Sequence, residues 1–132
     1  MGSTTVENIN LDGTDNAPGV AFDFEANHFR LTGMCFMEDV SGFFDPITTP
    51  FEKHVAALSG ADVTFEFGLH YFNSSAARVV LMLFDFLDEV AAKGNAVSIV
   101  WHHEDDEDMI EQGEEFGEDL EHATFTIVND DA

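Results

Sequence analysis

Apolar and polar residues alternate along several segments of the chain, a pattern typical of β-strands that bury one face. The longest such segment runs from Val63 to Tyr71 without interruption. Two shorter segments flank a turn at Ala26-Asn27 and together predict a hairpin. The predicted strands are residues 6–11, 20–24, 29–33, 63–71, 97–101 and 125–128.

In three other segments the apolar residues recur at helical spacing, which predicts helices over residues 38–58, 75–93 and 106–120. Pro46 and Pro50 interrupt the first segment, so a kink or two shorter helices is expected there rather than one straight helix. Gly94 lies just past the second helix, where glycine commonly ends helices. The third helix is acidic with an apolar side, as expected of a surface helix.

The order of these elements predicts an α/β fold. Strands and helices alternate through the second half of the chain, which calls for crossover connections and a mainly parallel sheet with helices packed on it. The N-terminal hairpin makes that sheet mixed. A length of 132 residues fits a single domain over residues 1–132, in which residues 1–18 form a polar lead-in.

The charge of the chain excludes several classes of function. With 27 acidic and four basic residues, the formal net charge is -23, so we expect no direct binding to nucleic acid phosphates. The same charge repels anionic membranes. It favours partners with basic surfaces, although adaptation to salt or simple solubility would also explain the acidity.

Features of a secreted or membrane protein are not apparent. No apolar run approaches the ~18 residues needed to span a membrane, and the polar start, Met1 to Val6, does not resemble a signal peptide. Cys35 is the single cysteine, so no internal disulfide can form. We therefore expect a cytoplasmic protein without membrane insertion.

The junction between the strand at 63–71 and the helix at 75–93 carries the most informative chemistry. Ser74 and Ser75 lie where the helix exposes unpaired N–H groups and the positive end of its dipole. A phosphate on Ser74, or as second choice on Ser75, would be held there by these groups, by Asn73 and by Arg78, four residues further on. The plainer interpretation is that a serine hydroxyl caps the helix, and the two roles are compatible.

An acidic run follows the strand at 97–101 and opens the third helix. It can be a solvated face, a docking surface for a basic partner, or a cation site, although the spacing of a calcium-binding loop is absent. His102 and His103 precede it, but neighbouring strand residues point to opposite faces, so at most one can face a given site. An enzyme with a metal at His103 and the Asp106 region is therefore the weaker alternative, and we expect no metal and no cofactor. The run comprises Glu104, Asp105, Asp106, Glu107, Asp108 and Glu111.

Three motifs resemble those of the SiaC family of bacterial regulatory phosphoproteins. Residues 71–75, Tyr-Phe-Asn-Ser-Ser, are similar to its YFNTSS motif, with Ser74 at the position of the threonine. Gly33, Phe36 and Glu38, followed by Phe43 and Pro46-Ile47, resemble its "G-x-x-[YF]-P-E-N … F-Y-x-P-I" segment. Trp101 and residues 104–116 resemble its long acidic motif "W-Y-Y-x-x-[DE]-D-E-D-M-x-E-x-G-E-E-F". The resemblance extends over residues 20–128.

This resemblance implies a STAS-like fold, as in anti-anti-sigma factors, and a non-enzymatic switch. It implies that Ser74 is phosphorylated by a serine/threonine protein kinase of the anti-sigma type and dephosphorylated by a PP2C-type phosphatase. The unphosphorylated protein is then expected to bind a diguanylate cyclase or a similar target, which links it to cyclic-di-GMP and biofilm signalling. Tyr71 and the acidic run are the expected partner-binding residues. The alternative is a constitutive protein-binding module in which Ser74 only caps a helix.

Overall fold

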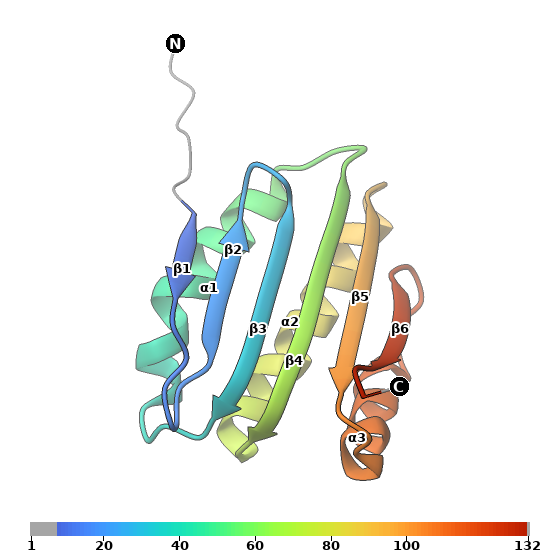
Figure 1. Cartoon of the computed structure of the whole chain (residues 1–132). Helices are drawn as coiled ribbons and strands as arrows, with labels where there is room; N and C mark the ends of the chain where they lie inside the picture. The colour runs from blue at the N-terminus through green and yellow to red at the C-terminus, as the bar shows by residue number, and fades with distance from the viewer. Residues whose placement is uncertain (1–7, 132) are drawn as a thin grey trace.

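Strands and helices of the computed structural model, which describes residues 8–131, alternate in the predicted order (Figure 1). The strands are β1 (Ile9–Leu11), β2 (Gly19–Asp23), β3 (His28–Cys35), β4 (Asp62–Phe72), β5 (Ala96–His103) and β6 (Thr124–Asn129). The helices are α1 (Val40–Ala56), α2 (Ser74–Ala92) and α3 (Glu107–Gly117). Part of the first predicted strand, including Val6, lies outside the described residues.

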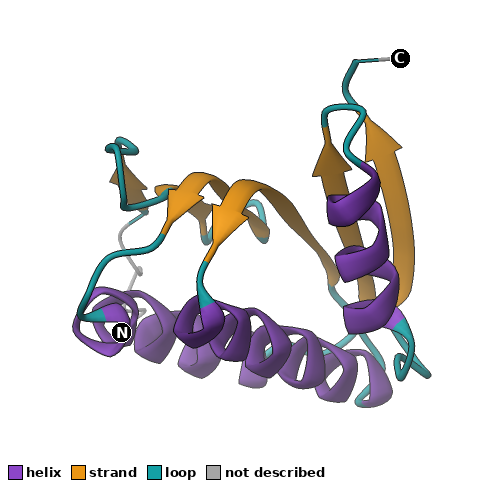
Figure 2. Cartoon of the chain, turned by 90° about the horizontal axis from the view of Figure 1, so that it is seen from below, coloured by secondary structure: helices purple, strands orange, loops and turns teal. Residues whose placement is uncertain are grey.

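One six-stranded sheet holds the strands in their order along the chain, from β1 to β6. The pairs β1–β2 and β2–β3 are antiparallel, whereas β3–β4, β4–β5 and β5–β6 are parallel. Each parallel pair is connected through a helix, and Figure 2 shows α1 and α2 side by side along one face of the sheet. This arrangement confirms the predicted α/β fold with a mixed, mainly parallel sheet and an N-terminal hairpin.

The core lies between the helices and the inward face of the sheet, and aromatic rings fill much of it. Phe22, Phe29, Phe51 and Phe65 pack at ring-centre distances of 4.8–6.1 Å, mostly edge to face. Burying each such ring stabilises the fold by roughly 1.5–3 kcal/mol. A second aromatic group surrounds Trp101, whose indole N–H donates to the Met109 carbonyl oxygen at 2.9 Å. That bond fixes α3 against β5.

Helix α1 is continuous through both prolines from Val40 to Ala56. The expectation of two shorter helices is wrong. Pro46 and Pro50 have no N–H to donate to the carbonyls four residues earlier, those of Gly42 and Pro46. Both of these residues are exposed, so water can satisfy the carbonyl groups without breaking the helix.

The other two predicted helices are confirmed with small changes at their ends. Helix α2 begins at Ser74, one residue earlier than expected, and ends at Ala92. Helix α3 ends at Gly117 rather than at residue 120. Close packing places that glycine on Phe125, since a Cβ at Gly117 would lie 2.8 Å from the ring. Within residues 8–131, no helix is long and apolar enough to span a membrane.

The face of the sheet opposite the helices carries polar side chains. Glu66, near the middle of β4, accepts hydrogen bonds from His28 on β3 and from His102 on β5, the latter at 2.7 Å. His102 also lies 3.0 Å from Asp130, through its Nδ1 and the carboxylate Oδ1. Charged and polar groups thus link four segments of this face. His28 and His102 are each two residues away from the position directly opposite Glu66, close enough for long side chains to meet diagonally.

Candidate functional site

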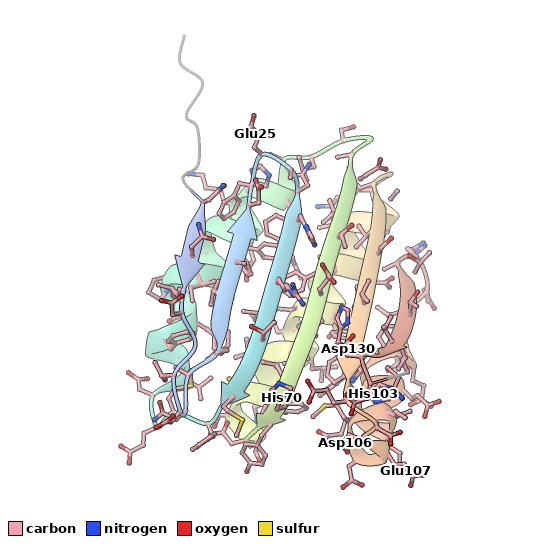
Figure 3. The ribbon with its side chains drawn as sticks, viewed as in Figure 1. Glu25, His70, His103, Asp106, Glu107 and Asp130 are labelled. Atoms are coloured by element: carbon pink, nitrogen blue, oxygen red, sulfur yellow. The ribbon has the colours of Figure 1, made fainter. Side chains whose placement is uncertain are left out.

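The predicted site residues lie at one edge of the sheet, where the parallel strands β3, β4 and β5 end. Parallel strands bring their carboxyl ends together, so the segments after Cys35, Phe72 and His103 share this edge. In Figure 3, His103, Asp106 and Glu107 lie at this edge beside the start of α3, whereas Glu25 lies at the opposite edge. Phe72 contacts Phe116 of α3 with ring centres 5.9 Å apart, which links the Ser74 junction to that helix.

Asn73, and not a serine, caps helix α2. Its side-chain oxygen accepts a hydrogen bond from the Ala76 N–H at 2.9 Å, and its backbone N–H donates to the Cys35 carbonyl oxygen at 3.1 Å. Ser74 is the first helical residue, and both Ser74 and Ser75 are exposed. Among the described residues, no hydrogen bond occupies either serine hydroxyl. The interpretation of Ser74 as the cap is therefore wrong, and its oxygen is accessible.

The first turn of α2 contains no acidic side chain, although the chain as a whole is strongly acidic. The Ser74 and Ser75 N–H groups have no acceptor within residues 8–131, as expected at a helix start. Their first turn contains no acidic residue, and the whole stretch 67–84 contains none. Asp39 and Asp106 cap α1 and α3, so α2 alone among the three helices of residues 8–131 has an uncharged cap. Within α2 itself, no carboxylate of the first turn balances the positive end of the helix dipole.

Arg78 is exposed one turn into α2, and within residues 8–131 it forms no salt bridge. Together with Ser75 it lines a depression of about 240 Å³ between the starts of α1 and α2. A guanidinium group four residues after Ser74 lies on the same side of the helix. It can therefore reach an anion attached to Ser74.

Tyr71 is exposed because of a bulge in β4. Gly33 pairs with Leu69 and Met34 pairs with Tyr71, so His70 is an extra residue in β4. The bulge reverses the alternation that the sequence predicts: Tyr71 is 50% exposed, whereas Phe72 packs towards Trp101. Gly33 has a φ of 90°, which favours glycine at this position.

Phe36 completes an exposed aromatic pair at this edge. Its ring lies 5.5 Å from the Tyr71 ring in a T-shaped arrangement, and 39% of the residue is exposed. Sequence reasoning did not select Phe36 as a partner-binding residue. The sequence feature that could have identified Phe36 was Gly33, since a glycine within a strand often marks a bulge that redirects neighbouring side chains.

The acidic run lies at the same edge and begins α3. Asp106 caps the helix by accepting from the Met109 N–H at 3.2 Å, and Asp105 adopts a left-handed conformation with φ of 49°. The Asp105 N–H donates to the Asn129 side-chain oxygen at 3.1 Å, which ties this turn to the end of β6. All six carboxylates of the run are exposed, namely those of Glu104, Asp105, Asp106, Glu107, Asp108 and Glu111.

The two histidines point to opposite faces of the sheet, as expected. His102 contacts Glu66 and Asp130 on the open face, whereas His103 is buried and its Nδ1 accepts from the Asp106 N–H at 3.3 Å. His103 Nδ1 and the Asp106 carboxylate therefore both have structural partners. In the part of the chain that the structure describes, no three His, Cys, Asp or Glu side chains are grouped so that they could hold a metal ion.

Hydrogen bonding controls the charge of the open-face network. Burial tends to raise the pKa of Glu66, but hydrogen bonds from His28 and His102, with the charges of His28 and Arg30, outweigh it and lower that pKa. For His102, burial tends to lower the pKa, but the bonds to Asp130 and Glu66 raise it above its ordinary value. Both shifts therefore favour the charged forms of the two groups.

Comparison with known proteins reveals relatives in both sequence and structure. An uncharacterised protein of Pseudomonas aeruginosa strain UCBPP-PA14 is 25% identical over 115 residues, which cover 86% of this chain and 90% of the relative. The crystal structure of apo-SiaC from P. aeruginosa is 25% identical, with a TM-score of 0.82, and the match covers 92% of this chain and 98% of SiaC.

A solved complex of the diguanylate cyclase SiaD with its activator SiaC, also from P. aeruginosa, contains a chain that is 24% identical to this one. That chain superposes with a TM-score of 0.82, over 91% of this chain and 99% of its own length. Residues 11–130 match the sequence profile described as SiaC family regulatory phosphoprotein. The chain thus belongs to the SiaC family of regulatory phosphoproteins.

Proposed function

We propose that this protein is a protein-binding switch, and that phosphorylation of Ser74 sets its state. A serine/threonine kinase of the anti-sigma type adds the phosphate, and a PP2C-type phosphatase removes it. The observation that carries the proposal is the division of roles at the start of α2: Asn73 caps the helix, while the Ser74 hydroxyl is exposed and takes no part in the cap.

The chemistry of this position suits a phosphate. A phosphoserine adds a charge of about -1.5 to -2, and the open N–H groups of the first turn are natural donors to it. The helix dipole contributes about 0.3–1 kcal/mol, and an exposed pair with Arg78 contributes up to about 1 kcal/mol. Because the cap is independent of Ser74, the modification changes surface charge and leaves the fold intact.

The partner surface in this proposal surrounds the modified serine. It comprises Tyr71 with its neighbour Phe36, the first turn of α2, and the acidic run from Glu104 to Glu111 at the same edge. Exposed aromatic rings are common anchors of protein interfaces, and carboxylates around them favour a basic partner. A dianion on Ser74 would lie within this surface, where a bound partner would have to accommodate it.

The target in this proposal is a diguanylate cyclase, or a similar protein, that binds the unphosphorylated form. The support is family membership together with the solved complex in which SiaC is named as the activator of SiaD. The protein would then act in cyclic-di-GMP signalling through contact with an enzyme and would catalyse no reaction itself.

Phosphorylation can be tested directly with a serine/threonine protein kinase of the anti-sigma type. We expect the intact mass of the wild type to rise by one phosphate, and fragment spectra to place the phosphate on Ser74. Ser75→Ala is the matched control, because Ser75 is an exposed hydroxyl in the same helical turn. It should be phosphorylated like the wild type, whereas Ser74→Ala should not.

Target binding tests the switch itself. We expect Ser74→Ala to bind the cyclase like the unmodified wild type, and both the phosphorylated protein and Ser74→Asp to bind about tenfold or more weakly, a difference of about 1.4 kcal/mol. Equal binding by all of these forms would instead identify a constitutive binding module. Phosphate transfer to a residue other than Ser74 would contradict the assignment of the acceptor.

A further inference from the structure

An apolar groove follows the seam between α1 and α2 and begins at Ser75, the residue after Ser74. Its near part is the depression lined by Ser41, Ser75, Arg78 and Met82, among others. Its far part, about 420 Å³, shares Arg78 and Met82 with the near part and continues along α2 to Glu89. The two parts therefore form one groove over the α2 residues 75–89, about 21 Å at 1.5 Å per residue.

The floor of this groove is exposed and hydrophobic. Leu81 and Met82 are 45% and 42% exposed, which is high for large apolar residues on a helix packed against a core. Phe86 lines the far part beside them. Methionine and leucine side chains adapt to different partners, and grooves floored with them commonly bind amphipathic helices.

The rim of the groove selects the charge of its occupant. Glu52 from α1 and Asp85 and Glu89 from α2 surround the far part, whereas Arg78 lies at the end near Ser74. A partner segment above Leu81 and Met82 would meet three carboxylates and one guanidinium group. Lysine or arginine at its far end would complement this rim, and an acidic segment would be repelled.

We propose that the α1–α2 groove is the docking site for a basic amphipathic helix of about four turns from a partner protein. The proposal rests on the proposed function, since it extends the partner surface around Ser74 along the α1–α2 seam and gives that part of the surface its own ligand. Apolar side chains of the partner would cover Leu81 and Met82, and its cationic end would lie beside Asp85 and Glu89. The other end of the partner helix would lie near Ser74, so the charge of a phosphate on Ser74 would act on that end.

A fluorescent peptide tests the groove without the natural partner. The probe is a labelled helix of about 14 residues with leucines along one face and lysines on the other, and its control is a scrambled peptide of the same composition. Fluorescence anisotropy with the full-length, unphosphorylated protein measures both. We expect the amphipathic peptide to bind at least about tenfold more tightly than the scrambled one.

Matched variants locate the binding. The double variant Leu81→Ser/Met82→Ser should weaken binding of the amphipathic peptide at least about tenfold, whereas Leu11→Ser should not, although Leu11 is 44% exposed. The double variant Asp85→Asn/Glu89→Gln should also weaken it. Its control, Glu114→Gln/Glu118→Gln, removes two exposed carboxylates at the same spacing at the end of α3, where Glu118 is the C-cap. All of these substitutions are at exposed positions, so the variants should remain folded.

Several results would overturn the proposal that the groove binds a basic amphipathic helix. Equal binding of the scrambled peptide, or equal weakening by the α3 control, would show that net charge alone attracts the probe. A dimer that forms in the wild type and is lost in Leu81→Ser/Met82→Ser would show that a second copy covers the surface. Failure of the kinase reaction would leave this experiment unaffected, because it uses unphosphorylated protein, so the two proposals can fail separately.

Discussion

The substitution Glu66→Gln should destabilise the protein in a pH-dependent way. Glu66 accepts from His28 and His102, and the side chains of Glu66 and His102 are only 18% and 14% exposed. A glutamine has one acceptor oxygen, so one histidine would face an NH₂ group instead, and the ionic attraction would be lost. A charge-assisted hydrogen bond at a partly buried site contributes about 1.5–3 kcal/mol, and the bond to half-exposed His28 contributes about 1 kcal/mol or less.

The sign of the pH dependence follows from the two pKa shifts. The pKa of His102 is raised on folding, so its contribution is complete below its ordinary value of 6.5 and is lost as the pH rises through the folded value. The pKa of Glu66 is lowered on folding, so its contribution is complete above its ordinary value of 4.5 and is lost as the pH falls through the folded value. Between these limits, both groups stabilise the native state fully.

Thermal unfolding at two pH values measures the effect. Since glutamine retains part of the hydrogen bonding, we expect a loss of about 1–2 kcal/mol near pH 5.5, which lowers Tm by about 4–8 °C for a chain of this size. At an alkaline pH at which His102 has lost its proton, the loss should fall to about half of that or less. Circular dichroism melts of variant and wild type at each pH give the two differences.

A matched variant separates the stabilisation by the His28–Glu66–His102 contacts from the general effect of removing a negative charge. Removing any carboxylate relieves repulsion in a chain with a net charge of -23, so Glu111→Gln, at an exposed position on α3, serves as the control. The relevant quantity is the Tm of Glu66→Gln minus that of Glu111→Gln. A difference that is absent, or equal at the two pH values, would refute the argument that the histidine–carboxylate pair stabilises the sheet.

Two further predictions concern α2 and α3. Gly113→Ala should lower the free energy of unfolding by about 1–2 kcal/mol, because a Cβ there would lie 2.6 Å from the Trp101 ring, although alanine restores up to about 1 kcal/mol of helix propensity. Urea unfolding followed by the fluorescence of this single tryptophan measures the loss, and an unchanged midpoint would contradict the close packing. Asn73→Asp should change the free energy of unfolding of the unphosphorylated protein by less than about 0.5 kcal/mol, since both residues cap helices well. In the phosphorylated protein it should raise the second pKa of the phosphate on Ser74 by like-charge repulsion. A ³¹P NMR titration that shows no rise would argue against a phosphate held at the start of α2.

The fold could be predicted almost entirely from hydrophobic spacing. The strands of this protein bury one face each, so alternation locates them, and the order of the elements then leaves few topologies. Helix α1 shows where local rules mislead. Pro46 and Pro50 remove two backbone bonds, but the carbonyl groups that lose their donors belong to exposed residues, and burial of Phe44, Ile47 and Phe51 holds the helix together.

The candidate site was predicted less completely, because its geometry depends on pairing between distant strands. The alternation through residues 63–71 suggests that Tyr71 faces inward, and only the register with β3 reveals the bulge that turns it outward. The exposure of Leu81 and Met82 could not be predicted from the sequence either, since apolar residues on a helix are usually assigned to the core. In this protein α1 covers only part of α2 and leaves these side chains accessible.

The roles of Asn73 and Ser74 show why exposure of a hydroxyl matters more than its presence at a helix start. If Ser74 were the cap, a phosphate on it would disrupt the bond to the first turn and cost about 1 kcal/mol of helix stability. The two states would then differ in folding as well as in charge. Because the Asn73 oxygen already accepts from Ala76, phosphorylation of Ser74 would leave the cap in place. A partner would therefore meet the same backbone in both states and distinguish them by charge at one point on its binding surface, which is what a reversible switch requires.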